Sequence, residues 1–122
     1  MSTLKLDTLS NKAGTASVPS DTIVSGTAKA WVNFNGTGTV AIRRAFNVSS
    51  ITDITTGDYQ INFSNAMSDA NYAIVTNGNR TNDERIGARQ SESTTAKCLI
   101  RSSDYTGGSN RDTDSVFVAI FS

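Results

Sequence analysis

The stretch AKAWVNFNGTGTVAIRRAFNVSSITD, residues 28–53, sets the expected fold and contains the chain's only tryptophan. Successive side chains of a strand point to opposite faces. The apolar residues that would share one face of such a strand are Ala28, Ala30, Val32 and Phe34. Trp31 then lies on the opposite face, beside Lys29 and Asn33. A large aromatic side chain among polar neighbours raises the question of what covers it.

Antiparallel β-structure is expected from this stretch onward, because apolar and polar residues alternate and Gly, Asn and Asp separate the runs. Asn35-Gly36 predicts a tight hairpin, since both central residues of such a turn take positive φ. Gly57 predicts a second hairpin. The expected strands are 28–34, 39–48, 58–64, 71–77, 84–91, 95–101 and 115–121. No segment has a convincing helical period, and only SNAMSDANYA, residues 64–73, leaves room for one helical turn.

The closing strand SVFVAIF, residues 115–121, is apolar on both faces, with Val116, Val118 and Ile120 on one and Phe117, Ala119 and Phe121 on the other. Such a strand is either central in its sheet or buried at a subunit interface. A two-layer domain buries only one face of each sheet. The remaining apolar residues therefore predict oligomerisation. The expected interface residues are Trp31, Phe117 and Phe121. The alternative is that Trp31 is half-exposed beside Lys29 or is turned inward by a bulge.

Residues 1–27 predict an extended N-terminal arm with one or two short strands. The apolar residues here are small in number and lie among Ser, Thr and Gly, too few to order the segment by themselves. The arm is therefore either mobile or laid on a partner surface. The residues expected to anchor it are Leu4, Leu6, Leu9, Val18 and Ile23. The predicted fold is all-β, a small antiparallel β-sandwich or jelly-roll-like domain at 28–122 preceded by this arm.

Composition excludes several classes of function. The 122 residues include 16 serines, 16 threonines and 11 asparagines, against 11 basic and 11 acidic residues. With no basic excess, a nucleic-acid partner is not expected. No apolar run reaches the length of a membrane span, and the N-terminus lacks the features of a signal peptide. Membrane insertion is therefore not expected, and cytoplasmic synthesis is.

Catalysis is not expected either. The chain has no histidine and a single cysteine, Cys98, so the usual nucleophile–base pairs are lacking. Cys98 lies on an apolar strand pattern and is expected to be buried. Carboxylate pairs such as Asp112 with Asp114 occur in turn-like segments, where Asp caps nearby backbone amides. No acidic cluster has the spacing of a calcium loop. We therefore expect no catalytic residues, no cofactor and no metal.

Surface recognition is the remaining possibility. The connectors at 77–85 and 102–114 combine amide, carboxylate, guanidinium and aromatic side chains, a mixture suited to binding sugars or another protein. The candidate recognition residues are Arg80, Asn82, Tyr105 and Arg111. Ordinary solvated β-loops contain the same mixture, so both interpretations stay open.

Several segments resemble virion proteins of tailed bacteriophages, in particular tail-fibre-like proteins of phages of cyanobacteria. These segments are TLKLDTLSNKAGT (3–15), residues 28–53, TGDYQINFSNAMSDANYAIV (56–75) and SVFVAIFS (115–122). The most specific piece is KAWVNFNGTGTVAIR followed by NVSSITD. The resemblance implies small β-rich modules that trimerise, attach to the particle through their N-terminal part and have no enzymatic activity. It makes Trp31 and the closing strand candidates for the subunit interface.

The function implied is that of a non-enzymatic, homotrimeric tail-fibre-like appendage, located in the virion and made in the host cytoplasm. Its expected partners are other virion proteins of the tail or capsid, with a host surface glycan as a further candidate. The chain has no shaft and only 27 residues precede the expected domain. An alternative is therefore a capsid decoration or cement protein that stabilises the phage head.

Overall fold

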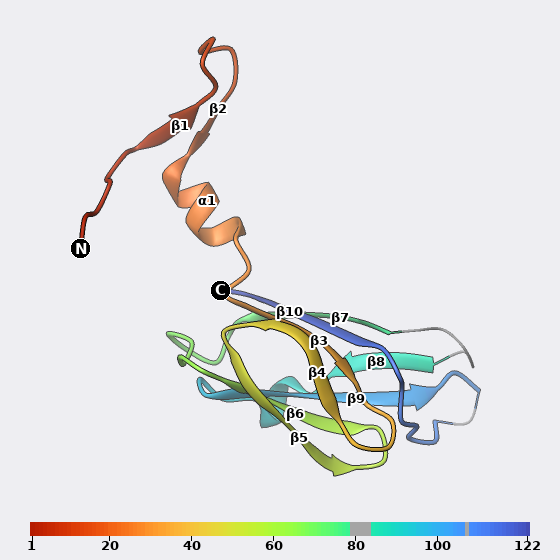
Figure 1. The fold of residues 1–122 in the computed structure, drawn as a ribbon. Coiled ribbons are helices and arrows are strands. Elements are labelled where there is room, and N and C mark those ends of the chain that lie inside the picture. Colours follow the sequence, from red (N-terminus) through yellow and green to blue (C-terminus); the bar gives the residue numbers. More distant parts are fainter. Residues whose placement is uncertain (79–83, 107) are drawn as a thin grey trace.

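The structure is a computed structural model that describes residues 1–78, 84–106 and 108–122 (Figure 1). For Glu84 only the backbone is described. In chain order the elements are β1 Thr8–Ser10, β2 Ser17–Pro19, α1 Ser20–Gly26, β3 Ala30–Asn35, β4 Ala41–Phe46, β5 Val48–Thr55, β6 Asp58–Phe63, β7 Ala73–Gly78, β8 Glu84–Ala88, the 3-10 helix η1 Gln90–Glu92, β9 Lys97–Asp104 and β10 Val116–Phe121.

Two four-stranded antiparallel sheets face each other as a sandwich (Figure 1). Sheet I has the strand order β4-β3-β10-β7, and sheet II has the order β5-β6-β9-β8. The predicted all-β antiparallel sandwich is therefore confirmed. The closing strand β10 is central, because it pairs with β3 on one side and β7 on the other.

The core lies between the sheets and follows the alternation expected from the sequence. Ala30, Val32 and Phe34 of β3 are buried, while Trp31 between them is exposed. Phe34 meets Tyr59 of sheet II edge to face, with ring centroids 5.2 Å apart. The other buried apolar residues are Ile61, Phe63, Met67, Tyr72, Cys98, Leu99, Ile100, Val116, Val118 and Ile120.

Between β4 and β5 the chain crosses from sheet I to sheet II, and the connection is one residue long, Asn47. Asn47 has a φ of 54°, a conformation that asparagine tolerates better than most residues. Its side chain donates to the carbonyls of Lys29 (3.0 Å) and Asn65 (3.1 Å) and accepts the Asn65 N–H at 2.8 Å. The corner thus holds together the start of β3 and the segment that follows β6.

The long connector between β9 and β10 is held by buried polar contacts around Tyr59. The Tyr59 hydroxyl lies 2.9 Å from the Gly36 carbonyl and accepts the Thr113 N–H at 3.3 Å. Gly57 donates its N–H to Asp112 Oδ1 at 2.7 Å. Ser102 and Thr113, both buried, share a hydroxyl–hydroxyl bond of 2.6 Å. These contacts tie the connector to both hairpin turns at this end of the sandwich.

Strand β5 is the main element that the sequence analysis missed. It forms an edge of sheet II, and its residues are exposed or half-buried, so VSSITDIT carries a weak apolar signal. The prediction of a continuous strand at 39–48 was wrong, because the chain turns at Asn47. The other predicted strands agree with the observed ones to within three residues at either end.

Helix α1 was also missed. It has seven residues, none of them buried, and Ile23 and Val24 are β-branched, so it shows no apolar helical stripe. Pro19 before the helix and Asp21 in its first turn are the only start signals. The helical turn that the sequence allowed at 64–73 is not formed.

The β3–β4 hairpin is confirmed, but the predicted tight turn at Asn35-Gly36 is wrong. The strands are joined by a longer loop, and the residue with positive φ is Gly38 (59°). Gly36 is required for a different reason, since a Cβ there would lie 2.5 Å from the Tyr59 hydroxyl. The hairpin predicted at Gly57 is present, and Gly57 has a φ of 73°.

Residues 1–27 contain β1, β2 and α1, and Figure 1 shows them apart from the sandwich. Strands β1 and β2 pair with each other as a two-stranded hairpin. None of the residues in this segment is buried. The arm is thus less extended than predicted, since it includes a hairpin and a helix.

Candidate functional site

The outer face of sheet I carries a row of apolar side chains that crosses all four strands. The cross-strand register aligns Phe46 of β4, Trp31 of β3, Ala119 of β10 and Val75 of β7. The next row places Phe117 between Asn33 and Asn77. We call Phe46, Trp31, Ala119, Val75, Phe117 and Phe121 the aromatic face.

The aromatic face is open to solvent in the single chain. Trp31 is 36% exposed, Phe117 42% and Val75 56%. Small Ala119 sits between large neighbours and leaves a hollow of about 310 Å³ lined by Trp31, Val75 and Phe117. Phe121 is half-buried in the same strand as Phe117. The structure thus brings the three predicted interface residues onto one face, and adds Phe46 and Val75 to them.

The outer face of sheet II is polar. A ladder of side-chain hydrogen bonds runs from Lys97 Nζ to Gln60 (2.9 Å), from Gln60 to Asn62 (2.7 Å), and from Asn62 to the hydroxyls of Ser50 and Thr52 (3.0 Å each). The two outer faces of the sandwich therefore differ in chemistry, one aromatic and one polar.

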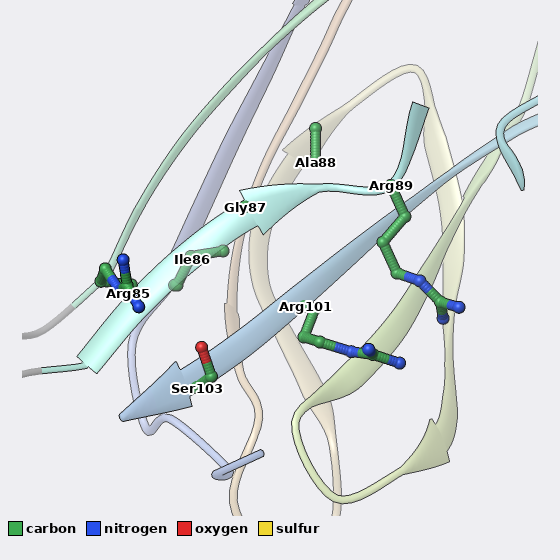
Figure 2. Close-up of a pocket in the computed structure, with 7 residues that line it drawn as sticks. All are labelled: Arg85, Ile86, Gly87, Ala88, Arg89, Arg101 and Ser103. Carbon is green, nitrogen blue, oxygen red and sulfur yellow. The ribbon is translucent and has the colours of Figure 1, made fainter. Parts of the chain in front are cut away.

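A groove on this polar face is lined by three arginines (Figure 2). Arg85 lies near the start of β8 and Arg89 directly follows its end, with Gly87 between them. Arg101 lies on the neighbouring strand β9. We call this site the arginine groove; its volume is about 360 Å³. Three cationic side chains in one groove make it a candidate site for an anionic group.

Asp58 anchors one side of the arginine groove. It is buried, and both its oxygens bind Arg101, at 2.6 and 2.7 Å, while Arg89 lies 3.4 Å away. The hydrogen bonds from Arg101 lower the pKa of Asp58 below its usual 3.8, although burial opposes this shift. Arg89 also pairs with Glu92. Asp58 is therefore ionised at neutral pH and holds Arg101 in a fixed orientation.

Asp58→Asn should lower the free energy of unfolding at pH 7 by about 1–2 kcal/mol. The substitution keeps the shape but removes the charge that binds Arg101, whose side chain is 44% exposed and partly screened by water. Because the folded-state pKa is lowered, this stabilisation is present above the usual value of 3.8 and is lost as the pH falls through the lowered value.

Urea unfolding of both proteins between pH 7 and pH 2 measures this effect. The difference in free energy of unfolding between wild type and variant should disappear at the acid end of this range. Asp53→Asn, at an exposed carboxylate of β5, is the matched control and should change stability little. A gap that stays constant across the whole pH range would contradict the role assigned to the Asp58 charge.

The predicted recognition residues fall into two groups. Arg80 and Asn82 lie outside the described residues. Tyr105 is exposed in the β9–β10 connector, and the Arg85 guanidinium lies over its ring, 5.2 Å from the centroid. Arg111, in the same connector, lies 3.4 Å from Asp104. Tyr105 thus borders the arginine groove, which the sequence analysis did not identify.

The side chains predicted to anchor the arm are accessible. Leu4, Leu6, Leu9 and Ile23 are exposed, and Val18 is half-buried in the β1–β2 hairpin. Leu9 and Val18 are directly opposite each other in that hairpin. They form a small apolar spot that nothing else in the chain covers among the described residues.

Cys98 is buried in the core, as predicted, and burial raises the pKa of its thiol to about 12. The thiolate is therefore not available at neutral pH. Within the described ranges, no group of three or more Cys, Asp or Glu side chains is placed to hold a metal ion. No helix in the described part of the chain is long and apolar enough to cross a membrane.

Comparisons with protein-family models, with curated proteins and with solved structures find no match to this chain.

Proposed function

We propose that this chain is a non-enzymatic structural protein of a phage virion that assembles as a homotrimer through the aromatic face and attaches by residues 1–27. The observation that carries the proposal is the aromatic face itself. Its exposed Trp31, Phe117 and Val75 lie on one continuous sheet surface. An apolar patch of this kind on a small domain favours a protein partner.

Self-association is supported by the arrangement of charge around this face. Arg43 of the edge strand β4 turns toward the β10 end, where it donates to the Asp114 carbonyl (2.7 Å) and the Ser115 hydroxyl (3.0 Å). The row formed by Phe46, Trp31, Ala119 and Val75 contains no charged residue. Three copies can turn this uncharged row toward a common threefold axis. Arg44, which lies opposite Asn33 on the exposed edge strand β4, then stays at the rim of the contact.

A virion role is supported by where the resembling segments lie in the fold. The most specific segment covers β3 and the first half of β4, and therefore includes Trp31 of the aromatic face. The NVSSITD segment covers the Asn47 corner and most of β5. Residues 1–27 lie apart from the sandwich, and their exposed leucines fit attachment to another virion protein. In this arrangement the polar sheet II remains free to face the host surface.

Removal of residues 1–24 should abolish incorporation into phage particles while changing the free energy of unfolding by less than about 0.5 kcal/mol. None of these residues is buried, so the sandwich does not need them. Incorporation is measured by immunogold labelling of purified particles and by blotting, and stability by circular dichroism in urea. The full-length chain is the control.

The position of the gold distinguishes the two virion roles. Gold at the tail would support the appendage, and gold spread over the head would support capsid decoration instead. Unlabelled particles with the full-length chain would overturn the virion proposal, and normal incorporation of the truncated chain would overturn the anchoring role of residues 1–27.

A further inference from the structure

Among the described residues, the arginine groove brings together three cationic side chains and two carboxylates. Arg101 and Arg89 share Asp58, and Arg89 also binds Glu92. Arg85 stacks on the Tyr105 ring, and among the described side chains it has no carboxylate partner. Among the side chains that the structure describes, three guanidinium groups thus face two carboxylates. This excess of one positive charge favours a ligand with a single anionic group.

Gly87 keeps the groove open. It lies opposite Arg101 in the β8–β9 register, between Arg85 and Arg89. A Cβ at Gly87 would meet nothing within 4 Å, so neither packing nor backbone conformation requires glycine here. Glycine weakens a strand interior and is found where a ligand or another backbone approaches closely. Its place in the middle of a cationic groove indicates room for a ligand.

The groups around the groove indicate the class of ligand. The Ser103 hydroxyl lines it, and Tyr105, which stacks under Arg85, is 66% exposed beside it. A hydroxyl and an aromatic ring complement the hydroxyls and C–H faces of a sugar, while a guanidinium binds a carboxylate through two N–H groups. The chain's net charge of +0 gives no general attraction to a polyanion.

We infer that the arginine groove binds a carboxylate-bearing sugar unit, as found in acidic saccharides. The carboxylate contacts Arg85, which lies opposite Ser103 in the β8–β9 register, and the sugar ring lies over Gly87. Tyr105 was expected from the sequence as a recognition residue, whereas the three arginines of the groove were not. The inference does not depend on a virion location. Failure of particle labelling and failure of sugar binding are separate results.

The test is a titration of the ¹⁵N-labelled full chain with D-glucuronate, followed by amide chemical shifts. Saturable shifts are expected at Arg85–Arg89 and Arg101–Ser103, with affinity roughly tenfold or more above that for D-glucose or acetate. Gly87→Val fills the groove and keeps its charge, and Arg85→Gln removes one charge without uncovering Asp58. Each should weaken glucuronate binding by about tenfold or more.

Arg44→Gln is the matched control. It removes an exposed arginine from β4 of sheet I and should leave glucuronate affinity within about twofold of wild type. Three outcomes would overturn the inference: no saturable shifts with glucuronate, equal affinity for acetate, or unchanged binding by a folded Gly87→Val protein. Equal affinity for acetate would identify a simple carboxylate site of the kind that an acidic peptide also fills.

Discussion

Gly57→Ala should destabilise the domain by about 2–5 kcal/mol, the sum of left-handed backbone strain and steric overlap. Gly57 has a φ of 73°, and a Cβ would lie 2.4 Å from the Ser102 carbonyl oxygen and 2.8 Å from the backbone N and O of Arg111. These are backbone atoms of β9 and of the connector, so no side-chain rotation relieves the overlap. Urea unfolding followed by circular dichroism measures the loss.

Two other glycines separate the causes of this effect. Gly38 also has positive φ, 59°, but a Cβ there meets nothing within 4 Å. Gly38→Ala should therefore lower the free energy of unfolding by only about 1–2 kcal/mol, through backbone strain. Gly87→Ala meets neither problem and should be neutral or slightly stabilising. If Gly57→Ala and Gly38→Ala lowered the free energy of unfolding by the same amount, close packing at Gly57 would not be what holds the β9–β10 connector.

Most of the sandwich could be predicted from the period of two in its hydrophobic residues. That period is strong where a strand is central in a sheet and one of its faces is buried completely, as in β3 and β10. In β3 it identified the buried residues and placed Trp31 on the opposite face. In β10 it separated Val116, Val118 and Ile120 from Phe117, but both faces are apolar, so the period alone did not decide which face is buried.

The elements that were missed lack this signal for physical reasons. The edge strand β5 buries no residue fully, and helix α1 buries none, so neither needs a regular apolar pattern. The fixed roles of Gly36 and Gly57 depend on atoms far away in the sequence, the Tyr59 hydroxyl and the backbone of Ser102. Such close approaches cannot be inferred from local turn preferences.

The arginine groove was only half visible in the sequence. In RIGAR, residues 85–89, a period of two places both arginines and the glycine on one strand face. Arg101 joins them only through the β8–β9 register, and Asp58 only through the β6–β9 register. The sequence analysis did not use this local pattern, which contains two of the three cations. The pairing that completes the groove is a property of the folded sheet.

Trp31→Lys combined with Val75→Lys should weaken self-association about a hundredfold or more. Both residues lie in the row that crosses the aromatic face, on either side of Ala119. Docking the face would then bury two ammonium groups of like charge without partners. In the single chain both positions are exposed, at 36% and 56%, so the variant should still fold. Sedimentation velocity and light scattering measure its assembly state.

Ile54→Lys provides the matched control, because Ile54 is 47% exposed on β5 of sheet II, away from the aromatic face. Wild type and this control should have three times the 12.9 kDa chain mass, whereas the double variant should be monomeric with an unchanged β-sheet circular dichroism spectrum. A folded double variant that remained trimeric would place the interface elsewhere. A monomeric wild type would mean that the aromatic face receives a different protein, and residues 1–27 would then become the first segment to test.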